Sequence, residues 1–305
     1  MKLNFLPAGR LRMKKSVYVP DADRSELFDL PVNSVLIRHK QGNVLFDSGC
    51  HPSVVDNAEE RWGSLAKVMK PVMSAQETLL PSLACVGLEP DDIDVVVNSH
   101  LHTDHCGCNE FFRRATILMH AKELEAASSP GAEAAGYLRK DWDTGQPIET
   151  VTAERDLFGD SSLVLVPLPG HTPGTLGALV SLDRDGQFLL ASDTVSLRQS
   201  LDTDTAPRNT WNAEALLKSF EQVRRIEKSG ATVICGHDDE QWQSLRKGEA
   251  GYELGQLRAV HRSLASPACR GADQADGRPE ASDRPGRVLR RSQAGPRTTR
   301  RFSAQ

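Results

Sequence analysis

Short apolar stretches bounded by turn residues recur along the chain and predict β-strands. Segments 34–38 and 43–47 flank Gln41-Gly42 and predict a hairpin. Further strands are predicted wherever a short run is rich in Val, Ile and Leu, at residues 93–97, 115–119, 163–167, 176–182, 187–191 and 231–235. The predicted strands lie in both halves of the chain.

Between these strands the apolar positions recur with helical spacing. Residues 75–87 and 121–127 each predict a helix. A longer helix is predicted between Asn212, which can cap its first turn, and Gly230, which ends it. Residues 128–150 show weak periodicity and predict a loop or lid. Two strand-rich halves with intervening helices indicate an α/β protein with two packed sheets covered by helices.

Composition is typical of a globular protein and indicates its compartment. Of the 305 residues, 39% are apolar and 26% are charged, and no apolar run approaches the length of a membrane-spanning helix. The first residues are interrupted too early for a secretory signal. Six cysteines at irregular spacing predict reduced thiols and a cytoplasmic location.

Charge divides the chain at about residue 257. Residues 258–305 contain eleven Arg and four acidic residues, a net charge of +7, whereas the preceding 257 residues carry −11. The tail has few large apolar residues, so we predict a folded domain over 1–257 and a disordered tail over 258–305. The tail has no aromatic interleaving that would favour nucleic-acid binding. It could equally be an extension without a partner.

The run from His100 to His105 gathers three imidazoles and a carboxylate directly after a predicted strand. His100, His102, Asp104 and His105 are spaced as HxHxDH, and imidazole and carboxylate are ligands that suit zinc and its neighbours in the transition series. Strand ends deliver such side chains to a shared edge of a sheet. The run therefore predicts a metal site.

Three further candidates each follow a predicted strand in the second half. His171 lies in a turn bracketed by Gly and Pro, Asp193 follows an apolar run, and His237 follows Gly236. The other four histidines lack this context and are interpreted as ordinary surface or core residues: His39, His51, His120 and His261. Seven donors that include two carboxylates can support a pair of metal ions.

The cysteines beside the motif leave an alternative open. Cys106 and Cys108 could act as thiolate ligands of zinc, but the neighbouring residues already supply enough nitrogen and oxygen donors. We interpret both as packing beside the metal site. Asp238, next to His237, is predicted to orient ligands from outside the coordination shell.

Together these motifs resemble the metallo-β-lactamase superfamily, and within it the N-acyl homoserine lactonases. The residues that carry the resemblance are the seven donors together with the stretches 6–10, 30–32, 46–49, 88–92, 98–102 and 236–238. It covers about residues 3–245 and excludes the Arg-rich tail.

The resemblance implies an αββα sandwich that holds two metals, usually Zn²⁺. His100, His102 and His171 would hold the first ion, and Asp104, His105 and His237 the second. Asp193 would bridge them. The implied reaction is the opening of a small-molecule lactone by a hydroxide that bridges the metals, with Asp104 relaying the proton to the departing alkoxide. A homodimer is compatible with the resemblance, and no membrane partner is expected.

Ser196 departs from the lactonase pattern. Related lactonases place a Tyr three residues after the bridging Asp, where its hydroxyl helps to hold the substrate carbonyl. Ser196 is a candidate substrate-binding residue at that position, but its hydroxyl is much shorter. Either another donor, such as one from 128–150, replaces the tyrosine, or the substrate range differs. Ser196 could also be a simple surface residue.

Other functions fit the sequence less well or share its metal site. Class B β-lactamases usually carry Cys where Asp193 stands, and phosphodiesterase-type nucleases usually add an RNA-binding exosite. Glyoxalase-II-like thioesterases share the donor set and remain an alternative. A non-catalytic scaffold would be expected to have lost donors.

Overall fold

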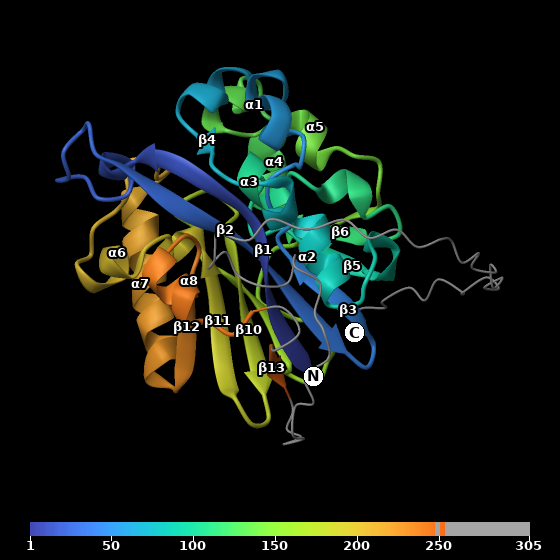
Figure 1. Ribbon diagram of the computed structural model, residues 1–305. Helices are drawn as coiled ribbons and strands as arrows, with labels where there is room; N and C mark the ends of the chain where they lie inside the picture. The colour runs from blue at the N-terminus through green and yellow to red at the C-terminus, as the bar shows by residue number, and fades with distance from the viewer. Residues whose placement is uncertain (248–250, 254–305) are drawn as a thin grey trace, which may run out of the picture. The chain divides into compact units, whose positions relative to one another are not determined.

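The computed structural model describes residues 1–247 and 251–253. Its described strands form two mixed sheets (Figure 1). The first contains β1 (Lys2–Lys14), β2 (Leu27–His39), β3 (Gly42–Phe46), β4 (Lys70–Pro71), β5 (Val95–Val97), β6 (Thr116–His120), β7 (Ile148–Val151) and β13 (Tyr252–Glu253). The second contains β8 (Arg155–Asp156), β9 (Leu163–Pro167), β10 (Leu176–Leu182), β11 (Gly186–Ser192) and β12 (Ala231–Cys235).

Helices cover the outer faces of both sheets. The α-helices are α1 (Val54–Trp62), α2 (Leu79–Cys85), α3 (Thr103–Cys106), α4 (Ala121–Ser128), α5 (Arg139–Trp142), α6 (Arg198–Asp202), α7 (Ala213–Lys228) and α8 (Asp239–Ser244). The 3₁₀ turns are η1 (Lys15–Val17), η2 (Gly63–Lys67), η3 (Ala75–Glu77), η4 (Pro90–Asp92), η5 (Asn109–Phe111), η6 (Ala132–Ala135) and η7 (Asp193–Val195). Helices α1 to α5 lie beside the first sheet, and α6 and α7 beside the second (Figure 1).

Three layers of core explain this arrangement. Alternate residues of β2, such as Val35 and Ile37, face the second sheet, whereas Leu36 faces the helices on the other side. The second sheet likewise packs against α7 through Leu216 and Phe220. Each sheet is apolar on both faces because each is covered on both faces. The predicted αββα sandwich is confirmed.

The predicted elements agree closely with the structure where periodicity was regular. The hairpin of β2 and β3 is antiparallel around Gln41-Gly42, and the strands predicted at 163–167, 176–182 and 231–235 have the bounds of β9, β10 and β12. Helix α7 is capped by Asn212, whose side chain accepts a hydrogen bond from the Ala215 amide.

Two predicted segments need correction. The helix predicted over 75–87 is divided at Thr78, which is extended, into η3 and α2. Pro81 explains the division, because proline is tolerated in the first turn of a helix but not in its interior. The segment 128–150 is not a plain loop, since it contains η6, α5 and the start of β7.

Strand β1 was missed by the sequence pattern. It contains Pro7 and Gly9, and its register with β2 shifts between them. A bulge of this kind breaks the alternation that identifies a strand.

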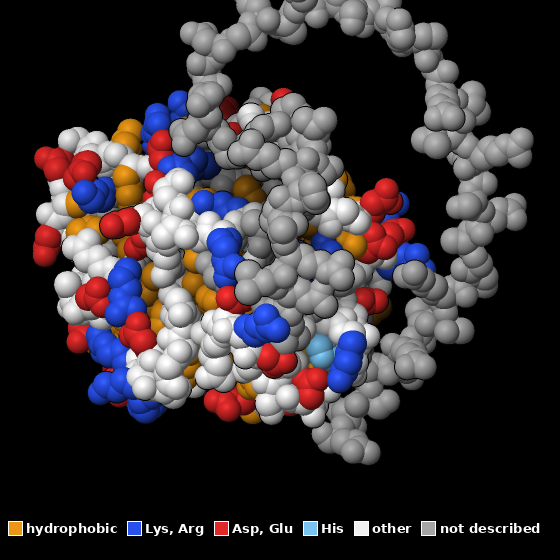
Figure 2. Space-filling view, turned by 60° about the horizontal axis from the view of Figure 1, so that its bottom comes forward, with side chains coloured by type: hydrophobic (Ala, Val, Ile, Leu, Met, Phe, Trp, Pro, Cys, Tyr) orange, Lys and Arg blue, Asp and Glu red, His pale blue; other side chains and the backbone are white. Residues whose placement is uncertain are grey.

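Cys50, Cys106, Cys108 and Cys235 are buried free thiols, as expected for these four positions. Basic and acidic side chains are interspersed over the described part of the face in Figure 2. None of the described helices is long and apolar enough to cross a membrane. The predicted tail, 258–305, lies outside the described residues.

Candidate metal centre

Strand ends from both sheets carry the candidate donors. Buried β5 leads into the turn that holds His100 and His102, and α3 then begins with Thr103, so that Asp104 and His105 lie in its first turn. His171 follows β9, Asp193 begins η7 directly after β11, and His237 follows β12. The sandwich thereby places segments from both halves of the chain at one edge.

The donor atoms form two groups of three. In the first, His102 Nδ1 lies 3.1 Å from His100 Nε2 and 3.1 Å from His171 Nε2. In the second, Asp104 Oδ2 lies 3.6 Å from His105 Nε2 and 3.7 Å from His237 Nε2. Within each group the ligand atoms lie within 4.8 Å of one another.

Asp193 faces both groups with its two carboxylate oxygens. Its Oδ2 lies 3.4 Å from His171 Nε2, and its Oδ1 lies 3.0 Å from His237 Nε2 and 3.5 Å from His105 Nε2. All seven donors predicted from the sequence therefore meet. His39, His51 and His120 take no part in these groups, and His261 lies outside the described residues.

Unsatisfied polar atoms test whether the residues fit a metal pair. His105 Nε2, His237 Nε2 and Asp193 Oδ1 are fully buried and make no hydrogen bond within the described part of the chain. Buried polar atoms are rarely left without a partner, and several that converge on one point indicate a site that binds a cation. The donor set and its geometry are consistent with a dinuclear metal site.

The two groups differ in their protonation. Burial lowers the pKa of His102 to about 3, and burial also lowers the pKa values of His100 and His171. Burial acts in the same direction on His105, but the charges of Asp104, Asp193 and Asp47 outweigh it and raise its pKa to about 10. The imidazoles of the first group are therefore neutral, as metal ligands must be. His105 is instead doubly protonated and must lose its second ring proton when a cation binds.

Asp47 orients the second group, and sequence reasoning did not identify it. Its Oδ2 accepts a hydrogen bond from His105 Nδ1 at 2.9 Å, and its Oδ1 accepts one from the Ser99 amide at 2.7 Å. These contacts leave His105 Nε2 free to face the centre. A carboxylate behind a metal-binding imidazole fixes its tautomer and orientation. The position of Asp47 at the end of β3, the strand paired with β5, was the available signal.

His237 is oriented by a backbone carbonyl. Its Nδ1 lies 2.9 Å from the Pro31 carbonyl oxygen, which can accept its proton. Asp238 does not orient a ligand, because its carboxylate caps α8 through the Gln241 amide and also accepts the Arg198 amide. The role predicted for Asp238 is therefore wrong, since the first turn of α8 directs its carboxylate to backbone amides.

Glu123 joins the two loops that carry the first group. Its carboxylate accepts hydrogen bonds from the Leu101 amide, the Thr172 hydroxyl and the Gly174 amide at 2.7–3.0 Å. Burial raises the pKa of Glu123 even though these donors act in the opposite direction. The contacts fix His100 and His102 relative to His171.

Two residues beside the donors have positive φ angles although neither is glycine. Asp47 has φ +60° and Ser192, which precedes Asp193, has φ +47°. Such conformations cost about 1–3 kcal/mol each and persist where the surrounding contacts enforce them. Here the Ser192 hydroxyl donates to Ser99 Oγ at 2.7 Å.

The remaining candidates have other contacts. Cys106 donates to the Leu101 carbonyl and Cys108 to the Cys50 carbonyl, and neither belongs to a donor group among the described residues. Ser196 is buried rather than on the surface, and its hydroxyl lies 3.4 Å from the Asp193 carbonyl oxygen.

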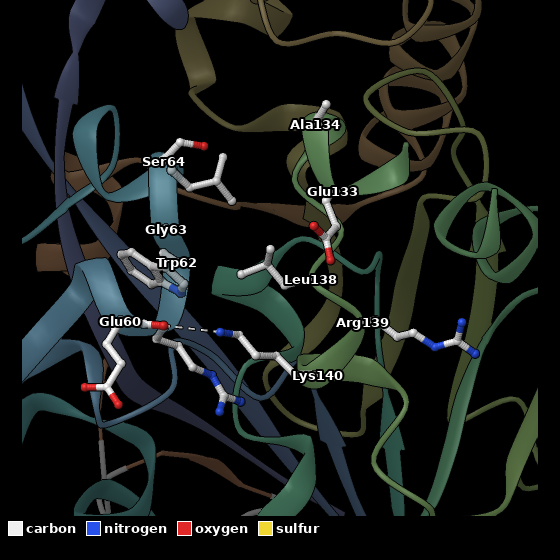
Figure 3. A pocket seen from close by; sticks show the side chains of 11 residues that line it. Glu60, Trp62, Gly63, Ser64, Glu133, Ala134, Leu138, Arg139 and Lys140 are labelled. Carbon is white, nitrogen blue, oxygen red and sulfur yellow. Dashed lines mark hydrogen bonds between the residues drawn. The ribbon is translucent and has the colours of Figure 1, made fainter. Parts of the chain in front are cut away.

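A pocket of about 740 Å³ lies between α1 and η2 on one side and η6 and α5 on the other (Figure 3). Trp62, Leu65 and Leu138 contribute apolar surface to it, and Arg139 and Lys140 contribute charge. Lys140 reaches across to the Glu60 carbonyl at 3.5 Å, as the dashed line in Figure 3 marks.

The walls of this pocket are connected to the metal-binding loop. Arg61 bonds Asp141 at 2.9 Å, and the other oxygen of Asp141 accepts the hydroxyl of Thr103, which lies between His102 and Asp104. Tyr137, next to Leu138, packs on His102 with ring centroids 5.2 Å apart. The residues that line the pocket therefore contact neighbours of the first group, whereas none of the seven donors lines the pocket itself.

Comparison with known proteins identifies the family. The family model described as the metallo-beta-lactamase superfamily matches residues 27–237. The chain belongs to this superfamily, whose match covers the whole donor set.

Individual relatives are named as lactonases. The chain is 31% identical over 260 residues to the N-acyl homoserine lactonase AttM of Azorhizobium caulinodans, covering 83% of this chain and 99% of that protein. It is 30% identical over 276 residues to the N-acyl homoserine lactonase AiiB of Agrobacterium fabrum, covering 82% and 98%. A solved N-acyl homoserine lactone hydrolase with N-hexanoyl-L-homoserine at its catalytic metal centre matches with a TM-score of 0.74 and 27% identity, covering 82% of this chain and 98% of that chain.

Proposed function

We propose that this protein is a dinuclear metal hydrolase that opens the lactone ring of N-acyl homoserine lactones. The observation that carries the proposal is the position of Asp193, whose two oxygens face one donor group each. The names of the relatives support the choice of N-acyl homoserine lactones as substrate, because this chain covers 98–99% of the length of those lactonases. We further propose Zn²⁺ as the metal.

The residues present assign the roles in the reaction. A bound metal pair would supply a water of lowered pKa as nucleophile, near neutrality instead of 15.7, and would polarise the ester carbonyl. His100, His102 and His171 would hold one ion, Asp104, His105 and His237 the other, and Asp193 both. Asp104 would hold its ion through Oδ2, which faces His105 and His237, so that its other oxygen, Oδ1, would pass the proton to the departing alkoxide.

The acyl chain of the substrate would occupy the pocket of Figure 3. The pocket adjoins the metal-binding loop through Thr103 and Tyr137, and its lining combines apolar and charged side chains. Such a lining suits a flexible chain that begins at a polar amide.

A second candidate shares the donor set. A glyoxalase-II-like thioesterase, or a lactonase for a different lactone, would need the same seven residues. The metal centre does not distinguish these reactions, so the substrate must be tested directly.

The experiment compares ring opening of N-acyl homoserine lactones of several chain lengths with hydrolysis of a thioester and of a nitrocefin-type β-lactam. The purified protein is first loaded with Zn²⁺ and its metal content is measured. We expect lactone opening to be at least about tenfold faster than the other two reactions. Absence of lactone turnover with two metals bound would exclude the proposed substrate, and preferential thioester cleavage would establish the second candidate.

The ligand assignment has its own test. His102→Ala should lose metal and activity, whereas His39→Ala should keep both, because His39 contacts Asp160 and Phe158 away from the centre. Two metals per chain and full activity in His102→Ala would show that the assignment is wrong.

A further inference from the structure

Tyr18 lies beside the second donor group and takes no part in the roles assigned above. It follows η1, and its side chain is 3% exposed. Its ring meets the His237 imidazole edge-on, with centroids 6.1 Å apart, and packs on Phe28 at 5.6 Å. The ring is therefore held in one place next to a predicted metal ligand.

The hydroxyl of Tyr18 has a weak partner. Its one hydrogen bond in the described part of the chain is donated to Met13 Sδ at 3.5 Å. A thioether is a poor acceptor, and buried tyrosine hydroxyls usually find a better one. This hydroxyl can therefore change partner at little cost when a stronger acceptor arrives.

The surroundings keep this hydroxyl a donor. Burial, followed by the negative charges of Asp193 and Asp104, raises the pKa of the Tyr18 phenol well above its usual value. A phenol keeps its proton at neutral pH in any case. The ring contact with His237 places Tyr18 beside the donor group of Asp104, His105 and His237.

Two other hydroxyls near the centre are committed to the protein itself. Tyr137 packs on His102 at the opposite group, and the buried carboxylate of Glu123 raises the pKa of its hydroxyl after burial. The Ser196 hydroxyl faces the Asp193 carbonyl. Among the tyrosines whose side chains the structure describes, Tyr18 is the one with a replaceable partner.

We propose that the Tyr18 hydroxyl donates a hydrogen bond to an oxygen of the ester group of the substrate, leaving Met13 Sδ when substrate binds. The inference rests on the proposed function, since it concerns the same reaction. A hydrogen-bond donor on a fixed ring that meets an oxygen as it becomes negative stabilises the transition state more than the ground state. Tyr18 would thereby supply from the N-terminal segment the hydroxyl that position 196 lacks.

Tyr18→Phe tests the proposal, because it keeps the ring between Phe28 and His237 and removes only the hydroxyl. We expect kcat/KM for the best lactone to fall about hundredfold, as for the loss of one donor to an oxyanion. Metal content and thermal midpoint should stay at the wild-type values. Met13→Leu is the matched control, since it removes the present acceptor and keeps the apolar volume, and its kcat/KM should stay within about threefold of wild type.

A binding measurement adds a readout that does not depend on turnover. The ring-opened product of the same lactone is titrated calorimetrically into the metal-loaded proteins. Tyr18→Phe should bind it about tenfold more weakly, whereas Met13→Leu should bind it as wild type does.

The outcomes separate this inference from the proposed function. Wild-type kinetics and product affinity in Tyr18→Phe would overturn the role of Tyr18 while leaving the lactonase intact. Loss of metal or of thermal stability in that variant would assign Tyr18 a structural role beside His237 and also overturn it. If the loaded wild type opens no lactone, the proposed function fails and this inference fails with it.

Discussion

Asp47 Oδ2 accepts a hydrogen bond from His105 Nδ1 at 2.9 Å, across 58 residues of chain. The same carboxylate accepts the amide and hydroxyl of Ser99, the residue before His100. One side chain thus positions the second donor group and anchors the start of the motif that supplies both groups.

Asp47→Asn should therefore lower the affinity for the metal ion that Asp104, His105 and His237 would hold. Loss of a carboxylate behind a metal-binding imidazole typically lowers affinity by about 10–100-fold. Metal stoichiometry after dialysis against a graded chelator measures this. Asp94→Asn is the control, because Asp94 also accepts a backbone amide, that of Asn43 at 2.8 Å, but away from the centre. Equal metal retention in the two variants would contradict the role of Asp47.

Metal binding should depend on pH differently at the two groups. The pKa values of His100, His102 and His171 are lowered, so these imidazoles are neutral near pH 7 and bind a cation without releasing protons. The pKa of His105 is raised to about 10 and that of His237 is also raised, so both must lose a proton first. A proton then competes with the second metal, and the competition grows as pH falls.

We expect the second metal to be held progressively more weakly as pH falls below about 10 and to be lost before the first, with proton release when it binds again. Metal analysis across this range and calorimetry in buffers of different ionisation enthalpy measure the two effects. Simultaneous loss of both metals, or binding without proton release, would contradict the difference between the groups.

Asp141 should contribute to the stability of the fold although it is not a metal donor. Its carboxylate is fully buried and bonds both Arg61 and Thr103. Asp141→Ala leaves the Arg61 guanidinium with Glu110 alone, and breaking a buried pair costs about 3 kcal/mol of unfolding free energy. Denaturant unfolding measures the cost. Asp29→Ala is the control, because it breaks an exposed pair with Arg12 and should change the free energy of unfolding little. Equal losses of unfolding free energy in the two variants would contradict the role of Asp141.

Gly170 should not tolerate a side chain. Its φ is +145°, and a Cβ there would lie 2.4 Å from Leu216 Cα, in the first turn of α7. Gly170→Ala should move the neighbouring His171 and lower both thermal stability and metal content. Gly87→Ala is a matched control, because φ is also positive (+74°) but nothing lies within 4 Å of the added atom. It should cost about 1–2 kcal/mol, from the left-handed conformation alone, and keep its metal.

The Arg-rich tail should be dispensable for the metal centre. A chain ending at Leu257 should keep its metal content, thermal midpoint and hydrolytic rate, because all seven donors and their supporting residues precede that point. Metal analysis and kinetics on the shortened chain measure this. A drop in either would show that residues 258–305 contribute to the folded domain.

Local patterns along the chain are enough to predict several elements and all seven donors. Strands β9, β10 and β12 and helix α7 were predicted with nearly correct bounds, because alternation and helical spacing report which face of a short segment is buried. The seven donors were identifiable because a metal requires particular residue types, and each donor follows a strand.

The contacts that surround those donors arise from the packing of segments that are distant in the sequence. The Pro31 carbonyl meets His237 across 206 residues. Asp47 bonds His105, and Tyr18 packs against the His237 ring, although both lie far from these histidines in the sequence. Asp238, adjacent in sequence to a donor, caps a helix instead. Such contacts depend on how two sheets pack rather than on the pattern within any one segment, so residue order does not reveal them.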